Sequence, residues 1–182
     1  MSPTIPLGLV RGRALLIVGL GVLLAEADSG ISHAQVVLDG KFGSGPVAGP
    51  NYNITAAMGA VRGNNLFQSF SQFNLVAGDV ATFSGPANIQ NILSRVTGGS
   101  PSSIDGTIRS DIAGANFFFI NPKGIIFGPN AAVDVSGAFA VSTANYLKLE
   151  GGAKFVASLD ADDSGLSSAP VAAFGFLESN PG

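Results

Sequence analysis

Hydrophobic and polar residues alternate most regularly between Val133 and Thr143. In this stretch the odd-numbered positions are hydrophobic, glycine or threonine, and the even-numbered positions are aspartate, serine or alanine. A period of two over so many positions predicts a half-buried β-strand, because successive side chains leave a strand on opposite faces. Two shorter apolar runs precede it, Asn116–Ile120 and Gly124–Phe127, separated by an Asn-Pro-Lys-Gly turn. Strand, tight turn and strand, with almost no charge, predict a coiled β-architecture.

Further short strands are expected along the chain, at Gln35–Leu38, Ile54–Val61, Val80–Phe83, around Ile104 and Ile108, at Tyr146–Gly152 with its turn, and at Val171–Leu177. The segment Ile89–Val96 fits either a helix or a strand. Three phenylalanines spaced by three fit a short 3₁₀ or helical turn that leads into a strand, or an aromatic cap over one end of a core; they are Phe67, Phe70 and Phe73. Ordinary core packing is expected of them, and not a platform for stacking a ligand. The polar residues 157–170 are expected to form a loop off the stack. The predicted fold class is an all-β solenoid with coils of about 20 residues.

The ends of such a solenoid are open sheet edges, which recruit other chains unless they are covered. The N-terminal strands and the three phenylalanines are expected to cover one end. At the other end the pattern stops in mid-course, on the turn Asn180-Pro181. We therefore expect a domain truncated at its C-terminal end, either a fragment of a longer protein or a shortened reading frame.

The segment 1–34 is predicted to be a secretory signal peptide, which makes 35–182 the mature domain. Arg11 and Arg13 precede a short apolar core, Ala14–Ala25, and small-residue cleavage sites follow, of which we favour the one after Ala34. The core is too short to cross a bilayer about 30 Å thick as a stable helix. An uncleaved membrane anchor is the alternative.

Composition and charge exclude several kinds of chemistry. Charged residues make up 12 % of the chain, about half of the usual share, and lysine and arginine occur singly, so no basic patch is present for nucleic acid. Without the leader the chain has neither histidine nor cysteine, which excludes Ser-His-Asp and Cys-His catalysis and His/Cys metal sites. The acidic run at 160–165 resembles the start of a calcium loop, but Val171 stands where the bidentate glutamate is needed. We expect a solvated acidic loop, and no metal, cofactor or catalytic residue.

Five segments, in this order, resemble the N-terminal secretion domain of filamentous-haemagglutinin-like exoproteins of two-partner secretion (TPS). They read NLFQSF at 65–70, FNL at 73–75, NILSRVTG at 91–98, IDGTI at 104–108, and GAN through NPKGI at 114–125. The resemblance covers nearly the whole mature chain. It implies a right-handed parallel β-helix with an N-terminal cap and small extra-helical hairpins.

The resemblance also implies a function, that of secretion signal and folding nucleus of a large adhesin-like or haemagglutinin-like exoprotein, and not an enzyme. The implied partner is a dedicated outer-membrane β-barrel transporter whose periplasmic domains bind the polypeptide. The implied route leads through the periplasm and the outer membrane to the medium or the cell surface. Downstream repeats of the same exoprotein and a glycan receptor on a host or other surface are the further expected partners.

The transporter contacts that the resemblance implies lie at two turns and are Asn121, Pro122, Lys123, Gly124, Asn88 and Asn91. The family motifs at these places are Asn-Pro-Asn-Gly, which here reads Asn-Pro-Lys-Gly, and Asn-Pro-Asn-Leu, whose place reads Gly-Pro-Ala-Asn-Ile at 85–89. Proline at the second and glycine at the fourth position are common in β-turns. A purely structural role, as turns that close the coils, therefore explains both motifs as well as direct contact with the transporter does.

A second function class is a β-helix carbohydrate-active enzyme or carbohydrate-binding module. Glycoside cleavage needs two carboxylates that flank the bond, and Asp105, Asp111 and Asp134 are the residues that folding could bring together. Such a site also needs acidic and basic residues gathered in a groove. The basic residues of the mature chain are spread along its whole length, which makes such a groove difficult to build.

Overall fold

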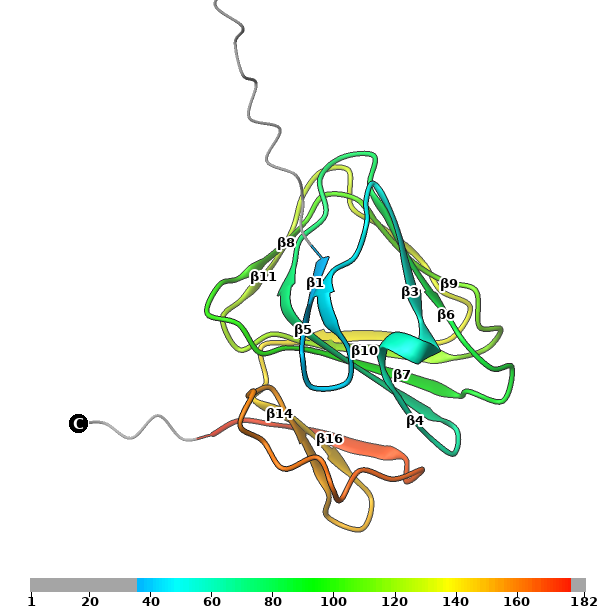
Figure 1. Ribbon diagram of the computed structural model, residues 1–182, viewed down its shortest axis with the longest axis vertical. Coiled ribbons are helices and arrows are strands. Elements are labelled where there is room, and N and C mark those ends of the chain that lie inside the picture. The colour runs from blue at the N-terminus through cyan, green and yellow to red at the C-terminus, as the bar shows by residue number, and fades with distance from the viewer. Residues whose placement is uncertain (1–35, 178–182) are drawn as a thin grey trace, which may run out of the picture. The chain divides into compact units, whose positions relative to one another are not determined.

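The computed structural model describes residues 36–177, all of which belong to the unit Ser32–Gly182. These residues form sixteen β-strands and one 3₁₀ turn (Figure 1). The predicted all-β class is therefore confirmed. The predicted signal peptide and the turn Asn180-Pro181 lie outside the described residues. Within the described part of the chain, no helix has the length and apolarity needed to cross a membrane.

Parallel strands stack in three walls (Figure 1). The first wall holds β5 (Asn65–Phe73), β7 (Asn91–Val96), β10 (Asn116–Ile120) and β13 (Phe139–Ser142). The second holds β3 (Asn51–Thr55), β6 (Val80–Ser84), β9 (Thr107–Ser110) and β12 (Ala132–Asp134), and the third holds β8 (Ser102–Ile104) and β11 (Ile125–Phe127). Successive strands of the chain belong to the second, first and third walls in a repeating order. The chain therefore forms a parallel β-solenoid of about four turns, and the predicted solenoid is confirmed.

The coils are longer than predicted, and they shorten along the chain. In the second wall Asn51 pairs with Val80, Val80 pairs with Thr107, and Thr107 pairs with Ala132. The sequence separation of paired residues therefore falls from each coil to the next. The additional residues lie at the corners between walls, which the strand pattern alone does not count.

Two strand predictions are wrong because the chain turns a corner inside them. The alternating stretch Val133–Thr143 is two strands, β12 and β13, with a corner between them, where a Cβ on Gly137 would collide with the carbonyl oxygen of Ala115. The predicted strand Ile54–Val61 is interrupted by the 3₁₀ turn at Ala56–Met58, after which β4 (Ala60–Arg62) reverses direction and pairs antiparallel with β5.

The three phenylalanines at 67–73 lie in the long strand β5, so the helical interpretation is wrong. The pairing of β5 with β1 skips Ser71, and this bulge places Phe70 and Phe73 on the same face although they are three positions apart. Both rings point into the solenoid, while Phe67 belongs to the core on the outer face of the wall. The ambiguous segment at 89–96 contains a strand, β7.

The N-terminal end of the first wall is covered by short antiparallel strands, as predicted, although strands and not rings form the cover. β1 (Val36–Asp39) pairs with the second half of β5, and β4 pairs with its first half. β2 (Ser44–Pro46) then pairs with β1 and forms the outermost edge. Because β2 is very short and ends in proline, this edge is a poor template for further strands.

Aromatic rings fill the solenoid interior. Phe73, Phe83, Phe117 and Phe139 come from successive coils, and neighbouring ring centroids lie 4.7–6.2 Å apart. Aromatic pairs at these separations stabilise a core beyond the area that they bury. This stack, together with buried aliphatic residues, makes a core for a chain that has no cysteine.

A second, antiparallel sheet lies outside the solenoid. Its strands are β14 (Tyr146–Leu149), β15 (Lys154–Val156) and β16 (Val171–Gly175), in the order β15-β14-β16. Leu147 and Phe155 of this sheet form a buried cluster with Phe67, Leu93 and Ile120 on the outer face of the first wall. The strands expected near 146–152 and 171–177 therefore exist, but they are not further coils of the stack.

Candidate functional site

The Asn-Pro-Lys-Gly segment is the corner between β10 and β11, and its first and last residues form a β-turn. The backbone N–H of Gly124 donates to the carbonyl oxygen of Asn121 at 3.1 Å. The side-chain Oδ1 of Asn121 accepts a second bond from the N–H of Lys123 at 2.9 Å. Gly124 has a φ of 122°, a backbone conformation that residues with a side chain rarely adopt. The local backbone therefore favours asparagine at 121 and glycine at 124.

Asn121 also ties three successive coils together. Its side-chain Nδ2 donates to the carbonyl oxygen of Ser100 at 3.1 Å and to Oγ of Ser102 at 3.0 Å, both in the preceding coil. Its backbone N–H donates to the carbonyl oxygen of Ser142 in the next coil at 3.1 Å. Asn121 is fully buried, whereas Lys123 at the tip of the turn is exposed. In the folded domain only the tip of this corner is accessible to a partner.

Asn88 and Asn91 lie at another corner, between β6 and β7. A β-turn closes there too, since the N–H of Ile89 donates to the carbonyl oxygen of Pro86 at 3.1 Å. Asn88 is exposed, and its Nδ2 is 3.3 Å from the carbonyl oxygen of Gly63. Asn91 begins β7 and is half-buried.

The structure does not bring the six predicted contact residues into one site. Asn91 is paired with Asn116, the first residue of β10, and Asn121 directly follows the last residue of that strand. Five residues of extended chain span about 16 Å. The two turns therefore lie at opposite ends of the first wall, and a single small ligand does not contact both.

A ladder of asparagine amides runs across the coils, and the sequence analysis missed it. Nδ2 of Asn91 donates to Oδ1 of Asn65 at 2.9 Å, and Nδ2 of Asn116 donates to Oδ1 of Asn91 at 3.1 Å. The ladder ends at the backbone N–H of Ala138, which donates to Oδ1 of Asn116 at 3.0 Å. The signal was present as asparagine at the matching position of three successive coils, but it is recognisable only when the coil length is known.

The carboxylates considered for glycoside cleavage each have a separate local role or position. Asp105 accepts bonds from the backbone N–H and the side-chain Nδ2 of Asn130, at 2.9 and 3.1 Å. Asp134 forms an exposed ion pair with Nε of Arg109 at 2.8 Å. Asp111 follows β9 at the next corner and is exposed. Asp105 therefore holds a turn, and Asp134 and Asp111 lie on the surface.

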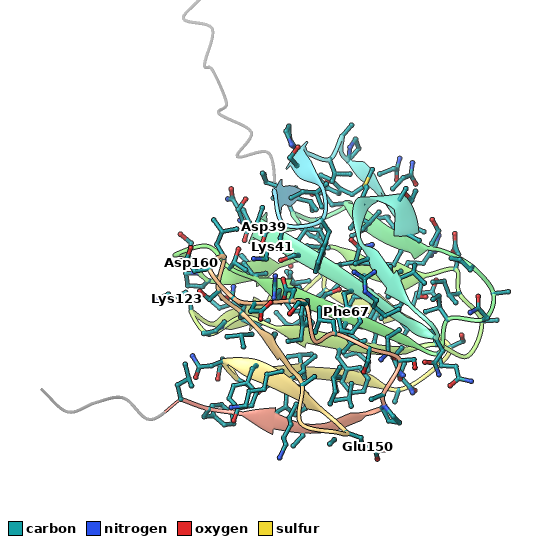
Figure 2. All side chains as sticks on the ribbon, turned by 60° about the horizontal axis from the view of Figure 1, so that its bottom comes forward. Asp39, Lys41, Phe67, Lys123, Glu150 and Asp160 are labelled. Atoms are coloured by element: carbon teal, nitrogen blue, oxygen red, sulfur yellow. The ribbon has the colours of Figure 1, made fainter. Side chains whose placement is uncertain are left out.

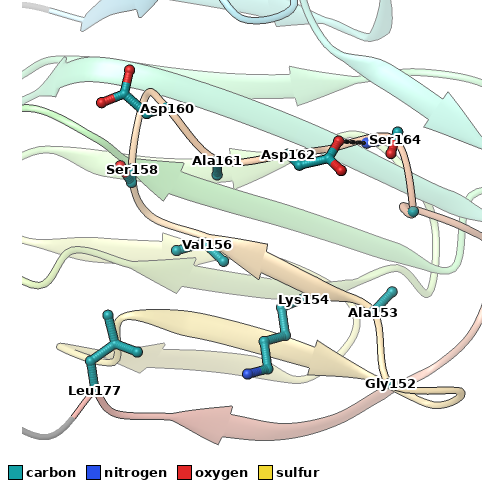
Figure 3. Close-up of a pocket in the computed structure, with 11 residues that line it drawn as sticks. Gly152, Ala153, Lys154, Val156, Ser158, Asp160, Ala161, Asp162, Ser164 and Leu177 are labelled. Atoms are coloured by element: carbon teal, nitrogen blue, oxygen red, sulfur yellow. Dashed lines mark hydrogen bonds between the residues drawn. The ribbon is translucent and has the colours of Figure 1, made fainter.

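The acidic run at 160–165 borders an open cleft of about 680 Å³, which it shares with β15 and Leu177 (Figure 3). Asp162 accepts a bond from the backbone N–H of Ser164 at 2.9 Å, and this bond, with the Ser164 hydroxyl, holds the pKa of the Asp162 carboxyl below its usual value. Asp163 points away to an ion pair with Arg95. Among the described residues, no three histidine, cysteine or acidic side chains are grouped so as to hold a metal ion.

Comparison with known proteins places this architecture in a family. A family model described as the TPS secretion domain matches residues 34–179, which include every described strand. No curated protein matches the chain. The family is non-enzymatic in general, and its members are exported through the outer membrane by a dedicated transporter. The chain belongs to the TPS secretion domain family and is the secretion signal and folding nucleus of a large exoprotein.

Proposed function

We propose that the transporter contacts this domain at the two corner turns, through Asn121, Pro122, Lys123 and Gly124 at one and through Asn88 and Asn91 at the other. The carrying observation is that the turn at 121–124 is closed by hydrogen bonds among its own residues, so it needs no neighbouring coil to form. The Lys123 ammonium at its tip makes no hydrogen bond or ion pair with the described residues. Asn121 and Gly124 set the turn that presents Lys123. Asn88 is the accessible side chain of the second turn.

The amides of Asn121 and Asn91 are available to a partner only before the coils stack. In the folded domain each amide is hydrogen bonded to a neighbouring coil. A transporter that binds these amides in the unfolded chain is therefore displaced when the chain folds, because the same donors and acceptors are then used internally. Folding outside the cell releases the domain in this proposal.

The test uses the purified periplasmic domains of the dedicated outer-membrane transporter. Their affinity is measured for the unfolded chain and for two variants, Lys123→Glu and Lys148→Glu. Lys148 is also exposed but lies on β14, far along the chain from either turn. Lys123→Glu removes one charged contact and places the opposite charge there, so this variant is expected to bind about tenfold more weakly or worse. Equal affinities of the two variants would show that the Lys123 turn is not recognised.

We further propose that the leader is removed after Ala34 and that 35–182 is the mature domain. Mass spectrometry of the exported chain is expected to find Gln35 at the N-terminus. An N-terminus at Asp28, produced by the alternative site Ala25-Glu26-Ala27, would contradict this.

We also propose an adhesin-like exoprotein at the cell surface, with downstream repeats that continue the solenoid and a glycan as its receptor. We propose no catalytic activity for this chain. Two of the candidate carboxylates, Asp105 and Asp134, are engaged by local partners, which supports this proposal.

A further inference from the structure

The loop Ala157–Pro170, called the strap below, lies against the stack and not away from it, which corrects the sequence prediction. It connects β15 to β16 and contains no strand of its own. The side chain of Leu166 is nevertheless buried, in the cluster on the outer face of the first wall. In Figure 2, Asp160 of the strap lies near Lys41 of the N-terminal cap, which consists of β1, β2 and the turn between them.

Three side chains from three different elements anchor the strap. Nζ of Lys41, in the cap, donates to the carbonyl oxygens of Leu159 and Ala161 at 3.1 and 2.7 Å. Nδ2 of Asn65, the first residue of the amide ladder, donates to the carbonyl oxygens of Ser167 and Ala169 at 2.9 and 2.8 Å. The third anchor is Arg95 of β7, which binds the carboxylate of Asp163.

Arg95 is the most strongly held of the three. Its guanidinium donates to both oxygens of Asp163, at 2.8 and 2.6 Å, and its side chain is completely buried. Nε donates to Oγ of Ser69 at 2.7 Å, and Cζ lies 4.3 Å from the ring centroid of Phe155. Asp163 is the only carboxylate that pairs with this guanidinium among the described residues. A buried charge that loses its partner is strongly destabilising, so Arg95 strongly favours the docked strap.

The anchoring surface exists only after the first coils and the cap have assembled. Oδ2 of Asp39, in β1, accepts bonds from Ser69 of β5 at 2.6 Å and from Thr97 beyond β7 at 2.8 Å. Ser69 in turn positions Arg95. The coils do not need the strap in order to assemble, because the pairing of β5 with β7 and of β7 with β10 involves no strap residue.

We propose that the strap is a lock that closes last, and that it slows the unfolding of the finished domain without speeding its folding. Contacts that are absent from the folding transition state act on the unfolding rate alone. A domain that must stay unfolded until it has crossed a membrane, and then persist outside, gains from such a contact because its lifetime is set by the unfolding rate. The proposal does not depend on which residues the transporter binds.

The test is a urea chevron of the folded chain and of Asp163→Asn, which is nearly isosteric and leaves the backbone bonds of the strap in place. The unfolding rate in water is expected to rise about 100-fold, since the Arg95 charge loses its counter-ion, while the folding rate changes less than about threefold. Asp160→Asn is the matched control. Asp160 is exposed in the same strap and makes no side-chain bond with the described residues, so both of its rates are expected to match the parent.

A change carried mainly by the folding rate, or an unfolding rate equal to that of Asp160→Asn, overturns the proposal. If Asp163→Asn does not fold, Lys41→Met decides, because it removes the weaker anchor at Leu159 and Ala161 and keeps the buried pair. Its unfolding rate is expected to rise about fivefold with an unchanged folding rate. Slower folding of Lys41→Met, or no change in either rate, would equally contradict a late-closing lock.

Discussion

Replacement of Asn91 by alanine removes the central amide of the ladder. Two neighbours then lose their partners: Oδ1 of Asn65, which is fully buried, and Nδ2 of Asn116, which is half-buried. A buried polar group left without a partner costs about 1–3 kcal/mol, and a partly hydrated one costs about 1 kcal/mol. The free energy of unfolding is thus expected to fall by about 2–4 kcal/mol, a large part of the roughly 5–15 kcal/mol of an ordinary domain.

The assay is urea unfolding followed by far-ultraviolet circular dichroism, with Asn53→Ala as the matched control. Asn53 lies on strand β3, and its side chain is exposed and outside the ladder. The control is expected to stay within about 0.5 kcal/mol of the parent. Equal midpoints and slopes for the two variants would refute the view that the amides hold the coils in register.

Three further predictions concern the core, the corner turn and the response to pH. Phe117→Ala, in the aromatic stack, is expected to lower the free energy of unfolding by about 3–5 kcal/mol, against less than about 1 kcal/mol for the partly exposed Phe127→Ala, both measured in urea. The double variant Asn121→Ala/Pro122→Ala is expected to slow export, measured as the amount of chain in the medium with time, and a normal export rate would show that the turn is not part of the signal. Burial, with Asp79, raises the pKa of Tyr52 above 10.0, so the folded state holds the phenol proton more tightly than the unfolded state does. The stability that Tyr52 contributes is complete below the pKa of tyrosine in the unfolded chain, and it is lost as the pH rises through the pKa of Tyr52 in the folded domain. Tyr52→Phe is therefore expected to show a smaller drop in the urea midpoint between about pH 9 and 11 than the parent does. An equal drop in both proteins would contradict this sign.

Sequence periodicity identified strands well but did not identify corners. The strand prediction at 80–83 is confirmed by β6, and that at 116–120 by β10. In both places a short, largely apolar segment lies between glycine-rich or polar turns. At Val133–Thr143 the alternation continues through a corner of small residues. Side chains in a solenoid point alternately in and out on both sides of such a corner, so the period does not reveal the bend.

The contacts that define the strap and the ladder were out of reach for a different reason. Arg95 stands in an apolar run, which is itself a sign of a buried charge, but its counter-ion lies 68 residues away in a polar loop. The predicted turn residues at 121–124 are correctly grouped, since local backbone chemistry determines a β-turn. Their distance from Asn88 and Asn91 depends on the pairing of strands in different coils, which no local pattern specifies.

The most direct test of the central claim is to produce the chain with and without its dedicated outer-membrane transporter, and to measure the protein that reaches the medium. A secretion domain that winds into coils outside the cell is expected to appear in the medium, folded and resistant to protease, only when the transporter is present. The same amount of folded chain in the medium without the transporter would contradict the account, and so would retention of the chain in both strains.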